Sequence, residues 1–293
     1  MVDQRAERPG MGWLPDYPDF RDYTPDHQVI KEILGRAKVS AAGQASLPAS
    51  VDLREWCSPV KDQGSLGSCT ANAGAGLVEH FERKAFGRHI DASRLFLYKV
   101  TRNLLQSTGD TGSFIRTTMG ALVLFGVPPE EYWPYEAADF DREPPAFCYA
   151  FAQNYQAIKY YRLDPPGISG ELLLKRIKEG LAAGLPQAFG FTVYNSVSQA
   201  GESGMIPFPS PGEKILGGHA MAAVGYNDSI KIKNNSRGGV ELTGALLVRN
   251  SWGSEWGSGG YGWLPYDYVL KGLAIDWWSL VKGEWIDTGN FGL

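Results

Sequence analysis

A cysteine at the start of an expected helix is the residue of this sequence best suited to nucleophilic chemistry. Cys69 lies near the end of the segment KDQGSLGSCT, residues 61–70, and is followed by a run with helical spacing of apolar residues. A thiol at a helix N-terminus meets unpaired N–H groups and the positive end of the helix dipole, and both favour the nucleophilic thiolate. The alternative interpretation is a small, buried, unreactive thiol.

Two polar residues far downstream offer the groups that would activate such a thiol. His219 lies in LGGHAMAAVGY, where two glycines before an apolar strand leave room to aim an imidazole. A solvated surface explains the settings of the other histidines, His27, His80 and His89. Asn250 lies at the end of an apolar strand, and its carbonyl can accept the proton of the far imidazole nitrogen. Taken alone, a buried histidine and an ordinary NSWG turn also explain these residues.

The elements that must position these residues change character along the chain. Apolar spacing predicts three helices, over residues 70–86, 113–125 and 171–184. Short apolar runs bounded by Gly, Pro, Asn and Ser predict three strands, over residues 187–193, 219–226 and 245–252. The polar stretch 227–244 is expected to form a long hairpin loop. We therefore expect an α+β chain with a helical lobe followed by a β-rich lobe.

Composition excludes several classes of function. The 293 residues are 43% hydrophobic, enough for one large domain or two packed lobes. A net charge of -4 with scattered Lys and Arg provides no basic field for nucleic acid. Apolar runs such as residues 120–127 are too short to cross a bilayer. No spacing of Cys and His indicates a metal site, so we expect no metal, and no other cofactor is expected. The charge and the short apolar runs likewise lead us to expect no nucleic-acid partner and no membrane partner.

The cysteines and the first residues bear on the compartment. Cys57, Cys69 and Cys148 allow at most one bridge, which suits a reducing compartment without excluding a Cys57–Cys148 disulfide. The start of the chain, MVDQRAERPGMGW, contains no apolar stretch of about 7 to 15 residues. The localisation stays open between the cytoplasm and export by a route without a standard signal peptide.

Three separated motifs, in order along the chain, resemble the papain family of cysteine peptidases. LPASVDLREWCSPVKDQGSLGSC resembles the start of the mature enzyme, GGHAMAAVGY the histidine strand, and NSWGSEWGSGGYGW the asparagine and tryptophan segment; YWPYE, residues 132–136, is a fourth match. The likeness covers about residues 47–280, and the short, disulfide-poor form is more similar to bacterial members. It implies a two-lobed fold with the active-site cleft between a helical lobe and a β-rich, barrel-like lobe.

The resemblance also implies a role for four residues. Cys69 would be the nucleophile, His219 the general base and acid, and Asn250 the group that orients the imidazole. Gln63, six residues before the nucleophile, would donate its side-chain amide to the oxyanion. A thiolate and imidazolium pair, with a lowered thiol pKa, would then hydrolyse peptide or protein substrates in a monomeric enzyme that needs no cofactor.

Two positions near the nucleophile depart from the family pattern. Leu66 stands where the family usually has a second cysteine, and Thr70 where it has a tryptophan. The first difference removes a disulfide and the second changes the packing at the helix start. We expect all three thiols to be free.

Substrate-binding positions follow from the same resemblance. Gly112 and Ser113, in TGDTGSFIR, would present backbone hydrogen bonds to an extended peptide. The side-chain pocket and its surroundings map to Phe114, Ile115, Gly190, Gly218, Ala220 and Trp252. The pocket should suit an apolar or aromatic side chain. Asp276 aligns either with an acidic pocket floor that would favour arginine or with an ordinary surface carboxylate.

The N-terminal extension differs from the rest of the chain. Residues 1–46, rich in Asp, Pro and Tyr over 15–26, are expected to cross and partly cover the cleft, or else to be a docked or frayed tail. Residues 47–293 would form the peptidase domain, with the helical lobe at about 60–160 and the β-rich lobe at about 161–280. Two alternatives to an endopeptidase remain: a catalytically silent peptide-binding scaffold, and a peptide ligase or transferase using the same acyl-enzyme.

Overall fold

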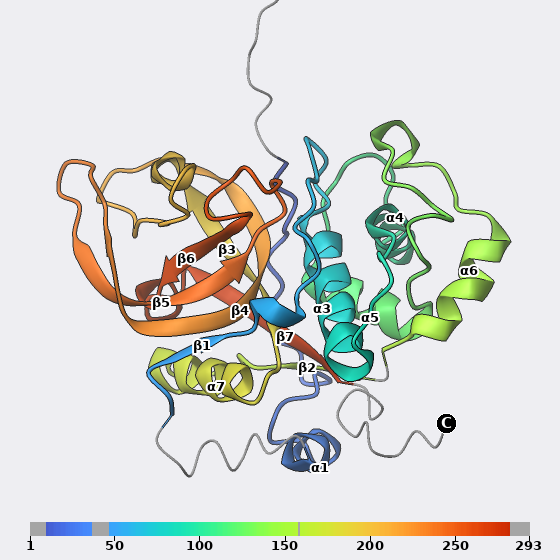
Figure 1. The fold of residues 1–293 in the computed structure, drawn as a ribbon, viewed down its shortest axis with the longest axis horizontal. Coiled ribbons are helices and arrows are strands. Elements are labelled where there is room, and N and C mark those ends of the chain that lie inside the picture. The colour runs from blue at the N-terminus through green and yellow to red at the C-terminus, as the bar shows by residue number, and fades with distance from the viewer. Residues whose placement is uncertain (1–9, 37–46, 158, 282–293) are drawn as a thin grey trace, which may run out of the picture.

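α-Helices form the region on the right of Figure 1. The computed structural model describes residues 10–36, 47–157 and 159–281. The helices are α3 (Cys69–Phe86), α4 (Arg94–Leu104), α5 (Ile115–Leu124) and α6 (Ala146–Ala152). The predicted helices over 70–86 and 113–125 correspond to α3 and α5, whereas α4 and α6 were not predicted.

An antiparallel sheet forms the other region. Its strands are β2 (Lys159–Arg162), β3 (Gln187–Tyr194), β4 (Ile215–Lys233), β5 (Glu241–Arg249), β6 (Tyr261–Pro265) and β7 (Ala274–Val281), in the order β2-β7-β3-β4-β5-β6. The short β1 (Ser50–Asp52) pairs with β4. The predicted helix over 171–184 is α7 (Gly170–Ala182), which packs against β3 and β4, and α8 (Asp267–Leu270) precedes β7. The predicted α+β class is confirmed.

The long polar loop expected over residues 227–244 was wrong. β4 continues to Lys233 and β5 begins at Glu241, so the two strands pair through most of this stretch. The sequence SIKIK alternates polar and apolar residues, which is a strand pattern, and Ile232 is buried. The loop interpretation followed polarity and overlooked this alternation.

Helix α3 lies between the two regions and sets the position of its first residue. It packs against α4 and α5 on one side and against β4 on the other. Gly74 allows close packing, because a Cβ there would lie 3.0 Å from the Thr118 side chain and 3.3 Å from that of Leu122. The helix ends at Gly87, whose φ of 69° is the left-handed conformation that favours glycine. Cys69 therefore begins a helix that is fixed on both sides.

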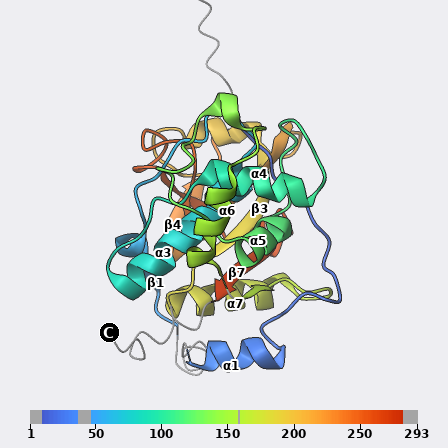
Figure 2. The same cartoon turned by 90° about the vertical axis from the view of Figure 1, so that its right-hand side faces the viewer.

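The N-terminal segment runs between the two regions and then beneath them, as the blue trace of Figures 1 and 2 shows. Trp13 forms a parallel bridge with Ser113. Helix α1 (Gln28–Arg36) lies at the base of the molecule, with Ile30 and Leu34 buried. None of the helices in the described ranges is long and apolar enough to span a membrane.

Candidate active site

The thiol of Cys69 is completely buried at the N-terminus of α3. Burial raises its pKa to about 11, although backbone N–H groups of Ala220, Gly12, Thr70 and Cys69 itself act to lower it. The expected lowering of the thiol pKa is therefore wrong for this closed arrangement. The helix N-terminus supplies favourable dipoles, but the lack of solvent around the sulfur outweighs them.

His219 and Asn250 form a buried pair. His219 Nε2 lies 2.8 Å from Asn250 Oδ1, and the same oxygen accepts a hydrogen bond of 2.8 Å from the Ser251 backbone N–H. Because Oδ1 is therefore the acceptor, Nε2 carries the proton and Nδ1 presents a lone pair. Nδ1 has no hydrogen-bond partner among the described residues. Burial lowers the pKa of His219 to about 4, so the imidazole is neutral here.

The backbone next to His219 lies beside the Cys69 thiol. The N–H of Ala220, the residue after His219, is one of the groups that act on the Cys69 sulfur. On its other side the imidazole stacks on Trp252, with ring centroids 4.5 Å apart and an interplanar angle of 25°. Helix α3 and strand β4 thus bring together residues separated by 150 positions in the sequence.

Gln63 is held in place beside this pair. Its Oε1 accepts a hydrogen bond of 2.5 Å from Ser251 Oγ, and its backbone N–H donates to the Ser251 carbonyl at 2.8 Å. Its Nε2 donates to the Leu66 carbonyl at 2.7 Å and to the Gly10 carbonyl at 3.0 Å. The side-chain amide of Gln63 therefore already donates to two backbone carbonyls, and one of them, Gly10 O, belongs to the N-terminal segment. Ser251 was not singled out from the sequence.

Residues 10–14, hereafter the strap, lie across the predicted substrate-binding positions. The backbone N–H of Ser113 donates to Gly12 O at 2.8 Å, and that of Leu14 donates to Ser113 O at 3.1 Å. The Trp13 N–H donates to Gly218 O at 3.2 Å. The strap is therefore hydrogen-bonded to both regions of the molecule. The glycines of the sequence GMGW were the signal that could have located the strap. Only glycine fits at position 12, because a Cβ there would lie 1.9 Å from Gly67 O.

The remaining substrate-binding positions differ in their surroundings. Gly112 has a φ of 70° and lies against Gly12, since a Cβ there would lie 2.2 Å from Gly12 O. Phe114 is half-buried before α5, whereas Ile115 is fully buried in the core. Trp252 lines a cavity of about 470 Å³ together with Met11, Leu216 and Trp256. Gly190 and Gly218 lie against the Trp13 ring.

Asp276 is buried, so the surface-carboxylate alternative was wrong. Its carboxylate accepts hydrogen bonds from Trp13 Nε1 at 3.0 Å and Trp278 Nε1 at 2.6 Å, and Arg162 Nη1 lies 3.4 Å away. Burial raises the pKa of Asp276 to about 6. The residue has a φ of 62°, which is unusual outside glycine. Sequence alone gave no sign that a tryptophan 263 positions earlier would meet it.

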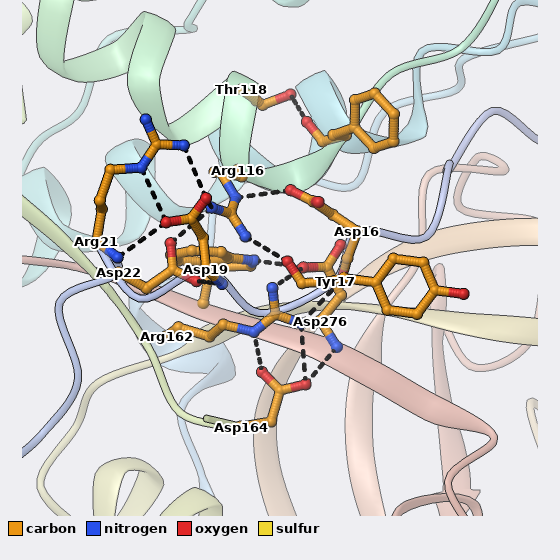
Figure 3. A network of polar contacts seen from close by, with 12 residues as sticks. Asp16, Tyr17, Asp19, Arg21, Asp22, Arg116, Thr118, Arg162, Asp164 and Asp276 are labelled. Carbon is orange, nitrogen blue, oxygen red and sulfur yellow. Dashed lines mark hydrogen bonds and ion pairs between the residues drawn. The ribbon is translucent and has the colours of Figure 1, made fainter. Parts of the chain in front are cut away.

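A polar network holds the chain that follows the strap, as Figure 3 shows. Arg116 Nε lies 2.6 Å from the Asp16 carboxylate, and Arg116 Nη1 lies 2.8 Å from that of Asp22. Arg162 Nη2 donates to the Asp16 carbonyl at 3.0 Å. Arginines of α5 and β2 thus bind the segment immediately after the strap.

A second cysteine and histidine pair lies apart from these residues. Cys57 Sγ is 3.8 Å from His80 Nδ1, and both side chains are buried. The surface interpretation of His80 was therefore wrong. Burial lowers the pKa of His80 to about 3 and raises that of Cys57, so the pair is neutral. All three cysteines, Cys57, Cys69 and Cys148, are free and buried. Within the described residues, no group of His, Cys, Asp and Glu side chains is arranged to hold a metal ion.

Known protein sequences are similar to this chain over most of its length. A family model described as papain family cysteine protease matches residues 47–271. An uncharacterized peptidase C1-like protein of Acanthamoeba polyphaga mimivirus is 36% identical over 280 residues, which cover 92% of this chain and 86% of that protein. Human cathepsin L2 is 29% identical over 218 residues, which cover 73% of this chain and 60% of cathepsin L2. The chain thus spans less than two thirds of cathepsin L2.

Solved structures are similar over most of the chain. Xylellain, a cysteine protease from Xylella fastidiosa, has a TM-score of 0.73 and 32% identity, covering 96% of this chain and 100% of xylellain. Bromelain from Ananas comosus, in complex with the E64 inhibitor, has a TM-score of 0.59 and 22% identity, covering 80% of this chain and 99% of bromelain. The second likeness concerns the fold alone.

Proposed function

This chain belongs to the papain family of cysteine proteases, and on that premise we propose that it is a cysteine endopeptidase with Cys69 as nucleophile. His219 is the general base and acid in this proposal, Asn250 orients it, and Gln63 donates to the oxyanion. The observation that carries the proposal is the His219–Asn250 hydrogen bond, which leaves the Nδ1 lone pair, beside the helix that begins at Cys69, without a partner in the part of the chain that the structure describes. A lone pair in that position is the acceptor that a thiol proton requires.

The proposed reaction begins with transfer of the Cys69 proton to His219 Nδ1. Sulfur attacks the peptide carbonyl carbon, and the carbonyl oxygen, now negative, accepts hydrogen bonds from Gln63 Nε2 and the Cys69 backbone N–H. The carbon–nitrogen bond breaks as the imidazolium gives its proton to the leaving amine. A water molecule, deprotonated by His219, then attacks the thioester, which releases the acid and restores the thiol.

The strap keeps this machinery closed in the proposed resting state. Gly10 O accepts a hydrogen bond from Gln63 Nε2, the group that would donate to the oxyanion, and Gly12 lies against the thiol. We place residues 1–46 as a regulatory extension and residues 47–293 as the peptidase domain, with a helical lobe at about 60–160 and a β-rich lobe at about 161–280. The hydrogen bonds of the strap to Ser113 and Gly218 support the assignment, because an extended substrate would use the same edges.

Alkylation of the thiol against pH tests the proposed nucleophile. In the full-length chain a cysteine-directed epoxide is expected to react slowly at neutral pH and faster as pH rises toward 11, because burial raises the pKa of Cys69. In a Trp13→Ala variant, water and reagent reach the sulfur, and reaction at neutral pH is expected through the ion pair with His219. Mass spectrometry should find the label on Cys69 alone.

The two other thiols serve as internal controls for this labelling. Cys57 and Cys148 are buried, and burial raises the pKa of each. Preferential labelling of either would contradict the assignment of the nucleophile. A Trp13→Ala profile that rises only around pH 8.5, as for an ordinary thiol, would contradict the ion pair.

Thr70 is expected to affect substrate binding more than chemistry. Its hydroxyl lies 2.5 Å from Ser113 Oγ and accepts from Thr118 Oγ1 at 3.1 Å, and all three residues are fully buried. These contacts fix the Ser113 backbone, which is the edge that binds an extended peptide. Thr70→Val should raise KM by about 2- to 10-fold with little change in kcat, the effect of one hydrogen bond. Thr70→Ser should restore the parent KM; a fall in kcat instead would indicate a role in the chemistry.

A further inference from the structure

The ring of Trp13 fills a slot whose walls contain glycine. A Cβ at Gly190 would lie 1.9 Å from the ring, and a Cβ at Gly218 would lie 2.8 Å from it. Gly190 on β3 and Gly218 on β4 lie on paired strands, two residues out of direct register, because Gly190 pairs with Ala220 and Gly218 with Thr192. Any larger residue at Gly190 would collide with the ring, so these two glycines give the slot the width of a flat aromatic side chain. Trp13 is only 6% exposed there.

The end of the slot holds a carboxylate that is aimed at the indole N–H. Trp13 Nε1 donates to Asp276 Oδ2 at 3.0 Å, whereas Asp276 Oδ1 is already engaged by Trp278 Nε1 and faces Arg162. The backbone N–H of Asp276 donates to Asp164 at 2.7 Å, and Asp164 accepts from Arg162 Nε at 3.0 Å. The acceptor is therefore fixed in place by surrounding charges and hydrogen bonds, independently of the indole.

These features favour an indole over the other side chains considered for this pocket. Phenylalanine would fit between the glycines but would leave Asp276 Oδ2 buried without its hydrogen bond, which is costly for a charged acceptor. An arginine has five N–H donors, and the slot offers them one free carboxylate oxygen. A side chain with a flat ring and a single N–H at its far end matches both the walls and the acceptor.

We propose that this pocket selects tryptophan as the second residue before the scissile bond of a substrate, with Trp13 of the strap occupying the same site in the closed enzyme. The inference rests on the proposed peptidase function and names the substrate class of that site. Asp276 is then the specificity-determining residue, and Arg162 positions its carboxylate. The strap and the substrate compete for one indole-binding slot.

Peptide series in the full-length Trp13→Ala variant test the inference. The peptides differ only at the second residue before the scissile bond, which is Trp, Phe, Leu, Arg or benzothienylalanine, in which sulfur replaces the indole N–H. We expect kcat/KM for Trp to exceed that for Phe and for benzothienylalanine by about 10- to 100-fold, the effect of one hydrogen bond to a charged group. Equal rates for Trp and benzothienylalanine, or a preference for Arg, would overturn the proposal.

An Asp276→Asn variant in the same background separates the acceptor from the shape of the slot. Its single carbonyl oxygen would remain with Trp278 and Arg162, so its NH₂ group would face the indole. The ratio of kcat/KM for the Trp peptide to that for the benzothienylalanine peptide should fall to about 1. An unchanged ratio would show that Asp276 does not recognise the indole N–H. If no peptide of the series is cleaved by the Trp13→Ala variant, the peptidase proposal itself fails; if all are cleaved alike, only the tryptophan inference fails.

Discussion

Replacing Cys69 with alanine is expected to lower the kcat for peptide hydrolysis by about 10⁴- to 10⁶-fold, as loss of a covalent nucleophile does in other peptidases. The comparison is best made in the Trp13→Ala background, where the cleft is open to substrate. The Cys69 side chain is small and buried beside the backbone of Gly12 and Ala220. Its removal should therefore leave the fold and peptide binding intact, and a full loss of turnover would report on chemistry alone.

Cys57→Ala is the matched control for this variant. It removes a thiol that lies 3.8 Å from a histidine nitrogen, His80 Nδ1, in a buried and neutral pair. We expect turnover to be retained, with a loss of unfolding free energy of about 1–2 kcal/mol from the small cavity. Loss of turnover in Cys57→Ala together with activity in Cys69→Ala would contradict the assignment of the nucleophile.

Trp13→Ala is expected to raise the turnover of a peptide substrate by about two to three orders of magnitude. The indole is almost completely buried and donates to Asp276, and truncating a buried tryptophan typically costs about 3–5 kcal/mol. In this chain the loss destabilises the closed arrangement relative to the open one, so the strap leaves the cleft more often. The measurement is kcat/KM for the full-length variant against the parent chain, with thermal unfolding to show that the domain remains folded.

Phe20→Ala is the control for an indirect effect of altering the N-terminal segment. Phe20 lies after the strap and is 97% exposed, so its truncation should change neither turnover nor stability. Deletion of all of residues 1–46 is a weaker test, because it removes the buried side chains of Ile30 and Leu34 and the Tyr23 carbonyl that accepts from the Arg162 N–H. Unchanged turnover in Trp13→Ala would show that the strap does not limit access.

Local sequence patterns were sufficient for much of the fold. Helical spacing of apolar residues predicted α3, α5 and α7. The strand β3 followed from a short apolar run. These features depend on contacts within a few residues, which is why periodicity reveals them. Where polar composition was weighed above alternation, over residues 227–244, the prediction failed.

The sequence by itself identified the residues of the candidate chemistry: Cys69, His219 and Asn250 stood out in their own segments, and the family resemblance added Gln63 and assigned the four roles. Only the tertiary structure decided their present state. The Trp13–Asp276 hydrogen bond joins residues 263 positions apart, and no local pattern encodes such a contact. Burial raises the pKa of Cys69 and lowers that of His219, so both are neutral. Solvent exclusion is a property of packing, which arises only once distant segments have come together.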